Sequence, residues 1–228
     1  MKRSEINREI TTAIALLEEH HFAMPPFAHW SPSQWKQVGP EANEIRSRAL
    51  GWDVTDFGSG AFHRIGLTVF TIRNGRVDDP KNKKVYAEKI LVVGENQVTP
   101  YHYHFSKTED IINRGGGDLA IDLHNSTEEG KLADTEVTVQ CDGVTRTVAA
   151  GGRITLGTGE SITLVPGVYH QFQAVAGTGT VLAGEVSSVN DDNVDNRFLE
   201  ELPRFPSIVE DEPPTRLLCN EYPAAAER

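Results

Sequence analysis

The sequence predicts an all-β domain, a barrel or sandwich, with a helical extension before it and an irregular arm after it. Short runs rich in β-branched and aromatic residues follow one another from about Phe62 to Val189, separated by turn residues. Three dipeptides in this region are typical of tight hairpins: Asn74-Gly75, Asp142-Gly143 and Gly151-Gly152. Before the region the apolar residues recur at helical spacing, and after it the chain is acidic and rich in proline.

The helical extension is expected to cover residues 1–60. Ser4 is a candidate N-cap of a first helix that ends near His20-His21, before the stop at Pro25-Pro26. The apolar face of this helix would consist of Ile6, Ile10, Ala13, Ile14 and Leu17. A second helix is predicted to start at Ser31-Pro32-Ser33, and a third to cover residues 41–49 with Gly51 as its stop. We expect these helices to pack on the barrel as a cap.

Ten strands are predicted in the β domain, which would span residues 61–190. They cover residues 67–72, 85–93, 99–105, 118–123, 136–140, 146–149, 153–156, 161–165, 170–174 and 179–186. The last segment, residues 191–228, is expected to form an arm that wraps the barrel or a neighbouring subunit.

The composition argues against several classes of protein. With a formal net charge of −11, the chain lacks the basic surface that a nucleic-acid binder presents to phosphates, and it is not expected to bind anionic membranes. No apolar stretch approaches the ~18 residues of a membrane span, and the charged residues after Met1 do not resemble a signal peptide. The two cysteines, Cys141 and Cys219, cannot form a disulfide framework. The sequence therefore predicts a cytoplasmic protein with no nucleic-acid or membrane partner.

The most informative pattern consists of three histidines and a glutamate. Residues two apart on a strand share a face, so His102 and His104 can converge on one ion, and a small turn then leads to Glu109. The turn at Pro166-Gly167 feeds a strand that can bring His170 as a fourth ligand. A lone histidine near a strand is more often structural, but residue type, spacing and turns agree for these four. Such nitrogen and oxygen ligands suit a divalent ion such as Mn²⁺, Fe²⁺, Ni²⁺ or Zn²⁺.

This spacing resembles the two motifs of the cupin superfamily. The first motif has the form HxH, a glutamate after three or four residues and a glycine after six more, which here are His102, His104, Glu109 and Gly116. The second motif matches at Pro166-Gly167 and His170. The resemblance implies a small antiparallel jelly-roll barrel with the ion inside its mouth.

Two further residues are candidates for proton transfer. Lys89 shares a strand face with apolar neighbours (Val85, Ala87, Leu91 and Val93), where an amine needs a partner. The alternative is that the strand is covered the other way round and Lys89 is solvated. Glu185 lies in a late strand of small and apolar residues. It is a candidate general base or an additional metal ligand, and the alternative is a carboxylate in an ion pair at the rim.

A polar cluster follows Glu185, with side chains of the types that bind sugar hydroxyls. It consists of Ser187, Asn190, Asp191, Asp192, Asp195, Asn196 and Arg197. The alternative interpretation is a solvated loop with local Asx turns.

Nearly the whole chain resembles the bacterial D-lyxose isomerase family. The stretches that carry the resemblance are residues 1–7, 88–90, 99–104, 107–117 and 184–192. The resemblance implies a homodimeric, Mn²⁺-favoured enzyme that interconverts D-lyxose with D-xylulose and D-mannose with D-fructose through a metal-stabilised cis-enediol. Glu185 would transfer the proton and Lys89 would protonate or stabilise the oxygen, with Asp191 and Arg197 holding distal hydroxyls. A metal-assisted hydride shift is the alternative chemistry, and Glu185 would then only position the substrate.

Three other functions share the same ligand set. An Fe²⁺ dioxygenase would need a redox-active ion and access for O₂. A phosphosugar isomerase would need a phosphate pocket, for which Arg64, Arg73 or Arg114 could be recruited. A non-enzymatic sugar-binding or storage cupin would bind sugar without turnover, and its ion would be structural.

Overall fold

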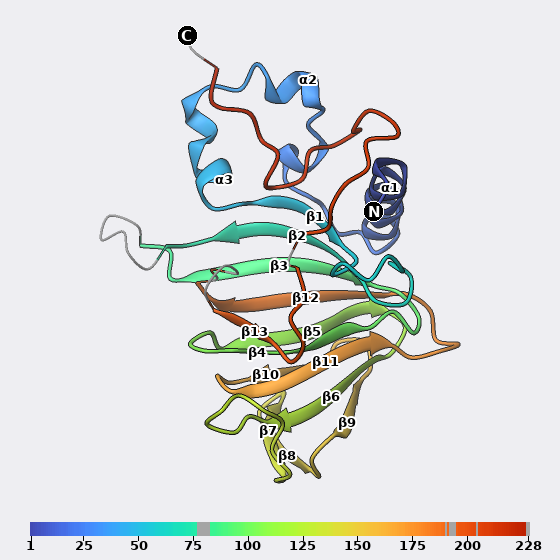
Figure 1. Ribbon diagram of the computed structural model, residues 1–228, viewed down its shortest axis with the longest axis vertical. Helices are drawn as coiled ribbons and strands as arrows, with labels where there is room; N and C mark the ends of the chain where they lie inside the picture. The colour runs from blue at the N-terminus through green and yellow to red at the C-terminus, as the bar shows by residue number, and fades with distance from the viewer. Residues whose placement is uncertain (77–82, 190, 192–194, 204, 227–228) are drawn as a thin grey trace.

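Two antiparallel sheets form the body of the protein. The computed structural model describes residues 1–76, 83–189, 191, 195–203 and 205–226. In this part of the chain the two sheets face each other, and short helices and the C-terminal arm lie together at one end (Figure 1). Neighbouring strands pair antiparallel throughout both sheets. The all-β fold class predicted from the sequence is thereby confirmed.

The larger sheet has eight strands, and the smaller has five. In spatial order the larger sheet consists of β1 (Gly51–Thr55), β2 (Leu67–Asn74), β3 (Tyr86–Val93), β12 (Val181–Ser188), β5 (Glu109–Gly116), β10 (Ser161–Leu164), β7 (Val137–Cys141) and β8 (Val144–Val148). The smaller sheet consists of β13 (Asn196–Phe198), β4 (Thr99–His104), β11 (Val168–Ala174), β6 (Leu119–Asn125) and β9 (Gly152–Leu156).

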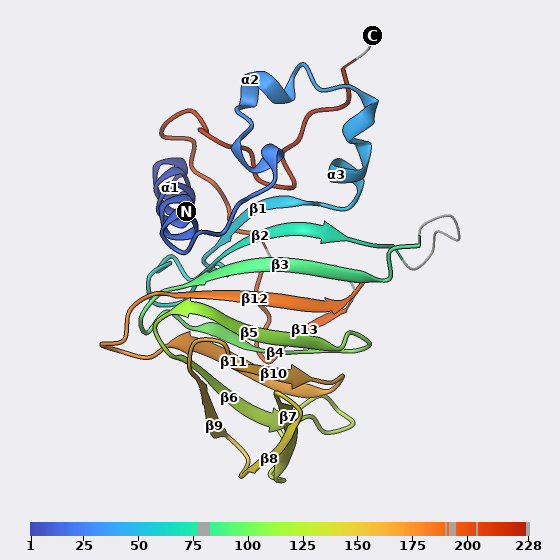
Figure 2. The ribbon, with the colours of Figure 1, turned by 180° about the vertical axis from the view of Figure 1, so that it is seen from behind.

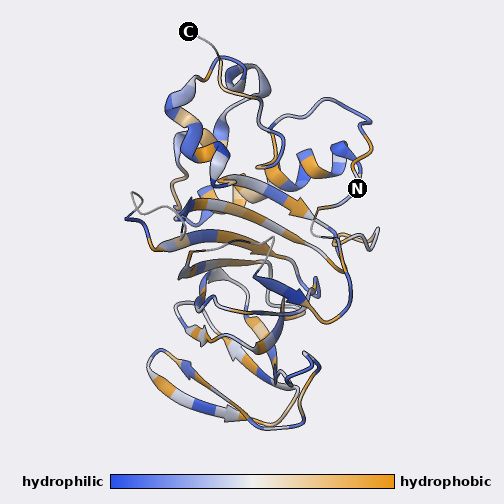
Figure 3. Cartoon of the chain, turned by 60° about the vertical axis from the view of Figure 1, so that its left-hand side comes forward, coloured by the Kyte–Doolittle hydropathy of each residue, from blue (hydrophilic) through white to orange (hydrophobic). Residues whose placement is uncertain are grey.

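The main hydrophobic core lies between the two sheets. Along β7, Val137 and Val139 are buried while Thr138 between them is exposed, and β5, β9 and β10 alternate in the same way. Figure 3 shows apolar and polar residues alternating along the strands. Full burial of a side chain such as Ile121 or Leu156 stabilises the fold by about 1.5–3 kcal/mol. This core holds the two sheets at a fixed separation and so fixes the walls of the space between them.

A second core covers the outer face of the larger sheet. The amphipathic helix α1 (Arg3–Glu19) buries Ile6 and Ile10 in one cluster with Phe70 and Ile90 of the sheet. The other helical elements are η1 (Pro26–His29), α2 (Pro32–Trp35), η2 (Pro40–Ala42) and α3 (Asn43–Ser47). They lie beyond β1, as the reverse view shows (Figure 2). The N-terminal helices therefore stiffen the sheet from outside, away from the space between the sheets.

The start of α1 differs from the prediction. Ser4 is not the N-cap, because the helix begins at Arg3 and the capping position is Lys2, whose side chain makes no capping hydrogen bond. Instead, Asp211 accepts hydrogen bonds from the backbone N–H and the hydroxyl of Ser4, at 2.9 and 2.7 Å. A carboxylate of the C-terminal arm thus satisfies the first turn of the helix, a contact that local sequence does not encode.

The ten predicted strands are present, with ends that shift by two residues at most, but three strands were missed. β1 begins at Gly51, where a helix stop was predicted. β5 was missed because Glu109–Gly116 mixes charged residues with glycines. β13 is short and follows a polar stretch. The boundaries drawn at residues 60 and 190 remain predictions, although β1 already belongs to the larger sheet.

The C-terminal arm packs against the N-terminal helices. The guanidinium group of Arg3 is buried and pairs with the carboxylates of Glu210 and Glu221. Farther along, the ring of Tyr222 stacks on that of Trp35 with centroids 3.9 Å apart. The N-terminal helical segment and the C-terminal arm therefore pack against each other. No helix in the described part of the chain is long and apolar enough to cross a membrane.

Candidate active site

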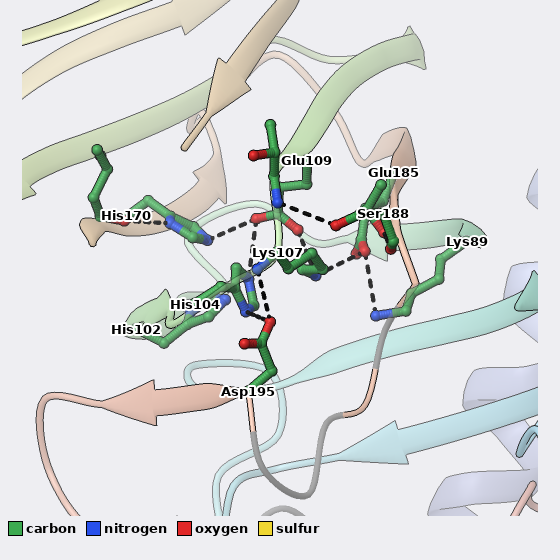
Figure 4. A network of polar contacts seen from close by, with 12 residues as sticks. Lys89, His102, His104, Lys107, Glu109, His170, Glu185, Ser188 and Asp195 are labelled. Atoms are coloured by element: carbon green, nitrogen blue, oxygen red, sulfur yellow. Dashed lines mark hydrogen bonds and ion pairs between the residues drawn. The ribbon is translucent and has the colours of Figure 1, made fainter. Parts of the chain in front are cut away.

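Three histidines meet between the sheets, as the sequence predicts. His102 and His104 are two residues apart on β4 and point to the same side, and His170 lies directly opposite His102 on β11. One ring nitrogen of each histidine lies within 4.8 Å of the others. Figure 4 shows the three rings converging with Glu109 from β5. Two strands of one sheet and one strand of the other thus bring together the four predicted ligands.

Backbone carbonyls orient two of the rings. His102 Nδ1–H donates to the carbonyl of Pro100 at 2.9 Å, and His170 Nδ1–H donates to that of Val168 at 3.0 Å. Each bond fixes the tautomer, so that Nε2 carries the lone pair and faces the centre of the cluster. This arrangement is typical of histidines that ligate a metal.

The contact between Glu109 and the imidazoles also fits a cation. Glu109 Oε1 lies 3.2 Å from His104 Nε2 and 3.1 Å from His170 Nε2. Both nitrogens are buried, and among the described residues neither has a hydrogen-bond partner of acceptable geometry. A lone pair on His170 Nε2 facing a carboxylate oxygen is repulsive, whereas a divalent cation between them would bind both. The donor set present here therefore fits a divalent metal ion.

The protonation states agree with this set. Burial lowers the pKa of His102 well below its ordinary value, and the neighbouring His170 and His104 lower it further. Burial alone would raise the pKa of Glu109, but the Lys107 ammonium and the imidazoles of His104 and His170 hold it well below its usual range. Neutral imidazole and ionised carboxylate are the forms that bind a metal.

Beside the four predicted ligands lies a chain of alternating charges that the sequence did not reveal as a unit. Lys107 Nζ lies 2.6 Å from Glu109 Oε2 and 2.9 Å from Glu185 Oε1, and Lys89 Nζ lies 3.3 Å from the same oxygen of Glu185 (Figure 4). Two lysines and two glutamates balance each other in formal charge. Lys89 and Lys107 are only 6% and 2% exposed, so these contacts are buried.

Glu185 and Lys89 face each other because their strands pair in register. Glu185 of β12 lies opposite Lys89 of β3, and both side chains point into the space between the sheets. Lys89 shares this side with Leu91 and Val93, which belong to the main core, while Val85 lies outside β3 and is exposed. The prediction that Lys89 occupies an apolar face is therefore confirmed for the residues of the strand.

One cavity is lined by the charged chain and by two of the three histidines, His102 and His104. Its polar lining consists of Lys89, Thr99, His102, His104, Lys107, Glu109, Glu185 and Asn196. Its apolar lining consists of Phe57, Leu67, Val69, Leu91, Ile111, Phe172 and Phe198. A few polar groups that converge within apolar walls are typical of a site for a small molecule.

Asp195 holds the loop between β4 and β5. Its Oδ1 accepts hydrogen bonds from the backbone N–H and the hydroxyl of Ser106, at 2.8 and 2.6 Å. Its Oδ2 accepts one from the backbone N–H of Lys107 at 3.0 Å and lies 4.0 Å from His104 Nδ1. The buried Asp195 carboxylate therefore positions the backbone of Lys107. For the polar cluster that contains Asp195, the sequence left open contact with sugar hydroxyls or a loop with local Asx turns.

The structure does not bring Arg197 into the cavity. On β13, Asn196 and Phe198 face the cavity, and Arg197 between them points to the opposite side, where it donates to the carbonyl of Glu129 at 3.1 Å. Asp191 is exposed and does not line the cavity. Two other members of the polar cluster, Asn190 and Asp192, lie outside the described residues.

The arginines considered for a phosphate pocket lie elsewhere. Arg73 pairs with Glu88 at 3.1 Å, and Arg114 lies over Gly184 in a separate pocket on the outer face of the larger sheet. Arg64 does not line the cavity, and no arginine is among the described residues that do.

Comparison with known families identifies the chain. The family model of D-lyxose isomerase matches residues 1–222. The chain belongs to the D-lyxose isomerase family. Two curated relatives, both called D-lyxose/D-mannose isomerase, come from Serratia proteamaculans and Escherichia coli O157:H7. Each is 50% identical over 223 residues, which cover 97% of this chain and 98% of the relative. As a member of this family, the protein is an aldose–ketose isomerase.

Solved structures support the fold of this D-lyxose isomerase family member. The L-ribose isomerase of Acinetobacter sp. DL28, in complex with L-ribose, aligns with a TM-score of 0.61 at 15% identity, over 91% of this chain and 98% of that one. The L-ribose isomerase of Cellulomonas parahominis, with L-psicose, aligns with a TM-score of 0.57 at 15% identity, over 92% and 98%. The predicted cupin-type barrel is therefore confirmed as the fold.

Sequence reasoning did not single out Lys107 and did not assign a partner to Asp195. A signal for Lys107 was available, because it lies two residues before Glu109 and residues two apart share a side of an extended chain. For Asp195 no local signal existed, since its partners Ser106 and Lys107 are 89 and 88 residues away in sequence.

Proposed function

We propose that this isomerase converts D-lyxose to D-xylulose and D-mannose to D-fructose, acting on free sugars with a divalent metal ion, Mn²⁺ being favoured. The observation that carries the proposal is the buried chain of Lys89, Glu185, Lys107 and Glu109, which lines one cavity beside His102 and His104 of the histidine cluster. The names of the relatives at 50% identity support the choice of sugars. The lack of an arginine among the described lining residues supports a substrate without phosphate.

The metal would be held by His102, His104, Glu109 and His170. When bound, it supplies a Lewis acid that polarises the carbonyl group of the open-chain sugar. Lys107 bonds the Glu109 oxygen that faces away from the histidines, and so holds this carboxylate in the orientation that a ligand needs.

Glu185 is the proposed base. In the aldose-to-ketose direction it removes the proton on C2 of the sugar and returns it to C1, while Lys89 moves a proton from O2 to O1. Lys89 and Lys107 both contact Glu185 Oε1, at 3.3 and 2.9 Å, so the carboxylate is held in one place with Oε2 left for the substrate. Glu185 is buried, so few water molecules can exchange with the proton that it carries. This position suits a single base that returns the same proton to the sugar.

Three finer points belong to the same proposal. We propose that the enzyme is a homodimer in the cytoplasm, on the strength of its family. Neither Asp191 nor Arg197 is kept as a group that holds distal hydroxyls of the sugar, because Asp191 is exposed and outside the lining of the cavity and the Arg197 side chain lies on the far side of β13. Lys107 is added to the residues proposed to act at the site, because it contacts both Glu109 and Glu185.

The first experiment tests substrate and metal together. The protein is stripped with a chelator, supplied with Mn²⁺, and assayed by chromatography with D-lyxose, D-mannose and mannose 6-phosphate. We expect conversion of the two free sugars only, and only with metal. Conversion of the phosphate alone, or oxygen uptake without sugar conversion, would overturn the proposal.

A second experiment tests the proton path. Isomerisation of D-mannose in D₂O is stopped at low conversion, and the D-fructose is examined by NMR for deuterium on C1. Exchange from solvent, even partial, supports proton transfer through Glu185. The complementary test starts from D-mannose labelled with deuterium on C2. If wild type and Glu185→Gln both transfer the deuterium to C1 without loss and at equal rates, a hydride shift is favoured instead.

A further inference from the structure

Strand β4 contains a bulge next to the ligand histidines. His170 and Phe172, two residues apart on β11, pair with His102 and Thr99, which are three residues apart on β4. One extra residue is therefore inserted in β4 between Thr99 and His102. In a regular strand, residues three apart point to opposite faces. Because of the bulge, Thr99 and His102 both line the cavity.

The hydroxyl of Thr99 has no hydrogen-bond partner among the described residues, although Thr99 is only 2% exposed. A buried hydroxyl without a partner is unfavourable in a folded protein, and natural proteins pair most such groups. Pro100, within the bulge, uses its carbonyl for His102 Nδ1–H. The bulge thus fixes a ligand ring and also brings Thr99, whose buried hydroxyl is unpaired among the described residues, to the wall of the cavity.

The cavity that Thr99 lines has a largely apolar wall beside its charged groups. The lining of the cavity includes the apolar side chains of Phe57, Leu67, Val69 and Phe172, and Phe172 pairs directly with Thr99 across the sheet. A threonine hydroxyl can both donate and accept a hydrogen bond, as a sugar hydroxyl can. A polar atom left unpaired among apolar walls is the kind of group that gives a binding site its specificity.

The position of Thr99 suits the far part of a sugar chain. His170 and Phe172, the strand partners of His102 and Thr99, are two positions apart on β11. The side chains of His102 and Thr99 therefore lie roughly 7 Å apart along the sheet. This distance is comparable to the length of an extended hexose. A sugar whose first two carbons face the histidines would present the hydroxyls beyond C3 to Thr99.

We infer that Thr99 is a specificity-determining residue whose hydroxyl binds a distal hydroxyl of the open-chain substrate. This inference rests on the proposed function, because the position of the first two carbons comes from it. It adds a residue outside the two cupin motifs, and without the bulge Thr99 would face away from the cavity.

The test uses Thr99→Val, which removes the hydroxyl and keeps the branched shape. Two opposite changes are expected. The value of kcat/KM for D-mannose falls about two- to tenfold through loss of one neutral hydrogen bond. The Tm of the substrate-free protein rises by about 2 °C or more, because an unpaired buried hydroxyl has been removed. A threonine with a purely structural role would lower both quantities or neither.

Deoxy sugars identify the partner. Wild type, Thr99→Val and Thr99→Ser are assayed with D-mannose, 4-deoxy-D-mannose and 6-deoxy-D-mannose. We expect one analogue for which Thr99→Val causes no further loss, because the hydrogen bond is already missing. Thr99→Ser, which keeps the hydroxyl, should retain more of kcat/KM than Thr99→Val. Thr155→Val, on the exposed side of β9, is the matched control and should change neither activity nor Tm.

The outcomes separate this inference from the proposed function. If the wild type converts no free sugar, the proposed function is wrong and the inference falls with it. If the wild type is active and Thr99→Val matches it on all three sugars, the inference alone is wrong. Should Thr99→Val not fold, Thr99→Ala replaces it, and equal losses on all three sugars would then overturn the inference.

Discussion

Replacing Asp195 with asparagine changes the support of the site without changing its shape. Asp195 Oδ1 bonds Ser106 and Oδ2 bonds the backbone N–H of Lys107. Asparagine has one acceptor oxygen, so one of the two backbone N–H groups would face an NH₂ group. A hydrogen bond to a charged group contributes about 1.5–3 kcal/mol, so we expect a loss of stability of this size. For a chain of this length, that corresponds to a decrease in Tm of about 3–12 °C.

The effect of Asp195→Asn on activity comes through Lys107. The loop that Asp195 holds carries Lys107 and leads to Glu109, so a looser loop displaces the ammonium that contacts Glu185. Misplacement by about 1 Å in an active site can lower a rate about 100-fold. We expect kcat to fall at least about tenfold, with KM changed less than about threefold, because Asp195 does not touch the substrate.

The assay compares Asp195→Asn with Asp122→Asn at a temperature where both are folded. Asp122 is a matched control: on the outer face of the smaller sheet, it accepts two hydrogen bonds from Arg153, at 2.7 and 2.9 Å, and does not line the cavity. Asp122→Asn should lose stability and keep kcat. Steady-state kinetics, metal content and thermal unfolding are measured for both. A kcat for Asp195→Asn within a factor of two of wild type, at full metal content, would refute the positioning role.

Four further predictions concern the ligands, the charged chain and the arm. Glu185→Gln and Lys89→Ala should keep the metal and lose most of their turnover, and near wild-type rates in both would contradict the proposed proton path. Lys107→Met should lower metal affinity, seen by titration calorimetry, as well as kcat, because both Glu109 and Glu185 lose a buried partner; an unchanged affinity would argue against the orienting role. His102→Ala, or treatment of the wild type with chelator, should abolish activity with loss of metal and lower the Tm, and full activity without metal would contradict the ligand assignment. Arg3→Met should lower the Tm by about 4 °C or more, because it removes the buried guanidinium and its hydrogen bonds to two carboxylates. The kcat at 25 °C should stay unchanged. An unaltered Tm would show that the two chain ends do not stabilise each other.

The sequence determined the parts of this protein that depend on neighbours along the chain. Alternation along strands, turn dipeptides and the spacing of His102, His104 and Glu109 are local patterns, and they predicted ten strands and a group of ligands that the structure brings together. The position of Lys89 on an apolar strand face was predicted from the same alternation. Nearly the whole chain also carried the resemblance to its family, which the comparisons confirmed.

Only the tertiary structure decided the contacts between distant segments. Lys107 meets Glu185 across 78 residues, and Asp211 meets Ser4 across 207, and no local pattern records either pair. The bulge that turns Thr99 inward exists because β4 pairs with β11 out of step, and the side on which Arg197 lies follows from the pairing of β13 with β4. A one-residue shift reverses the face of a side chain, so orientation is set by strand pairing, which is a property of two segments at once.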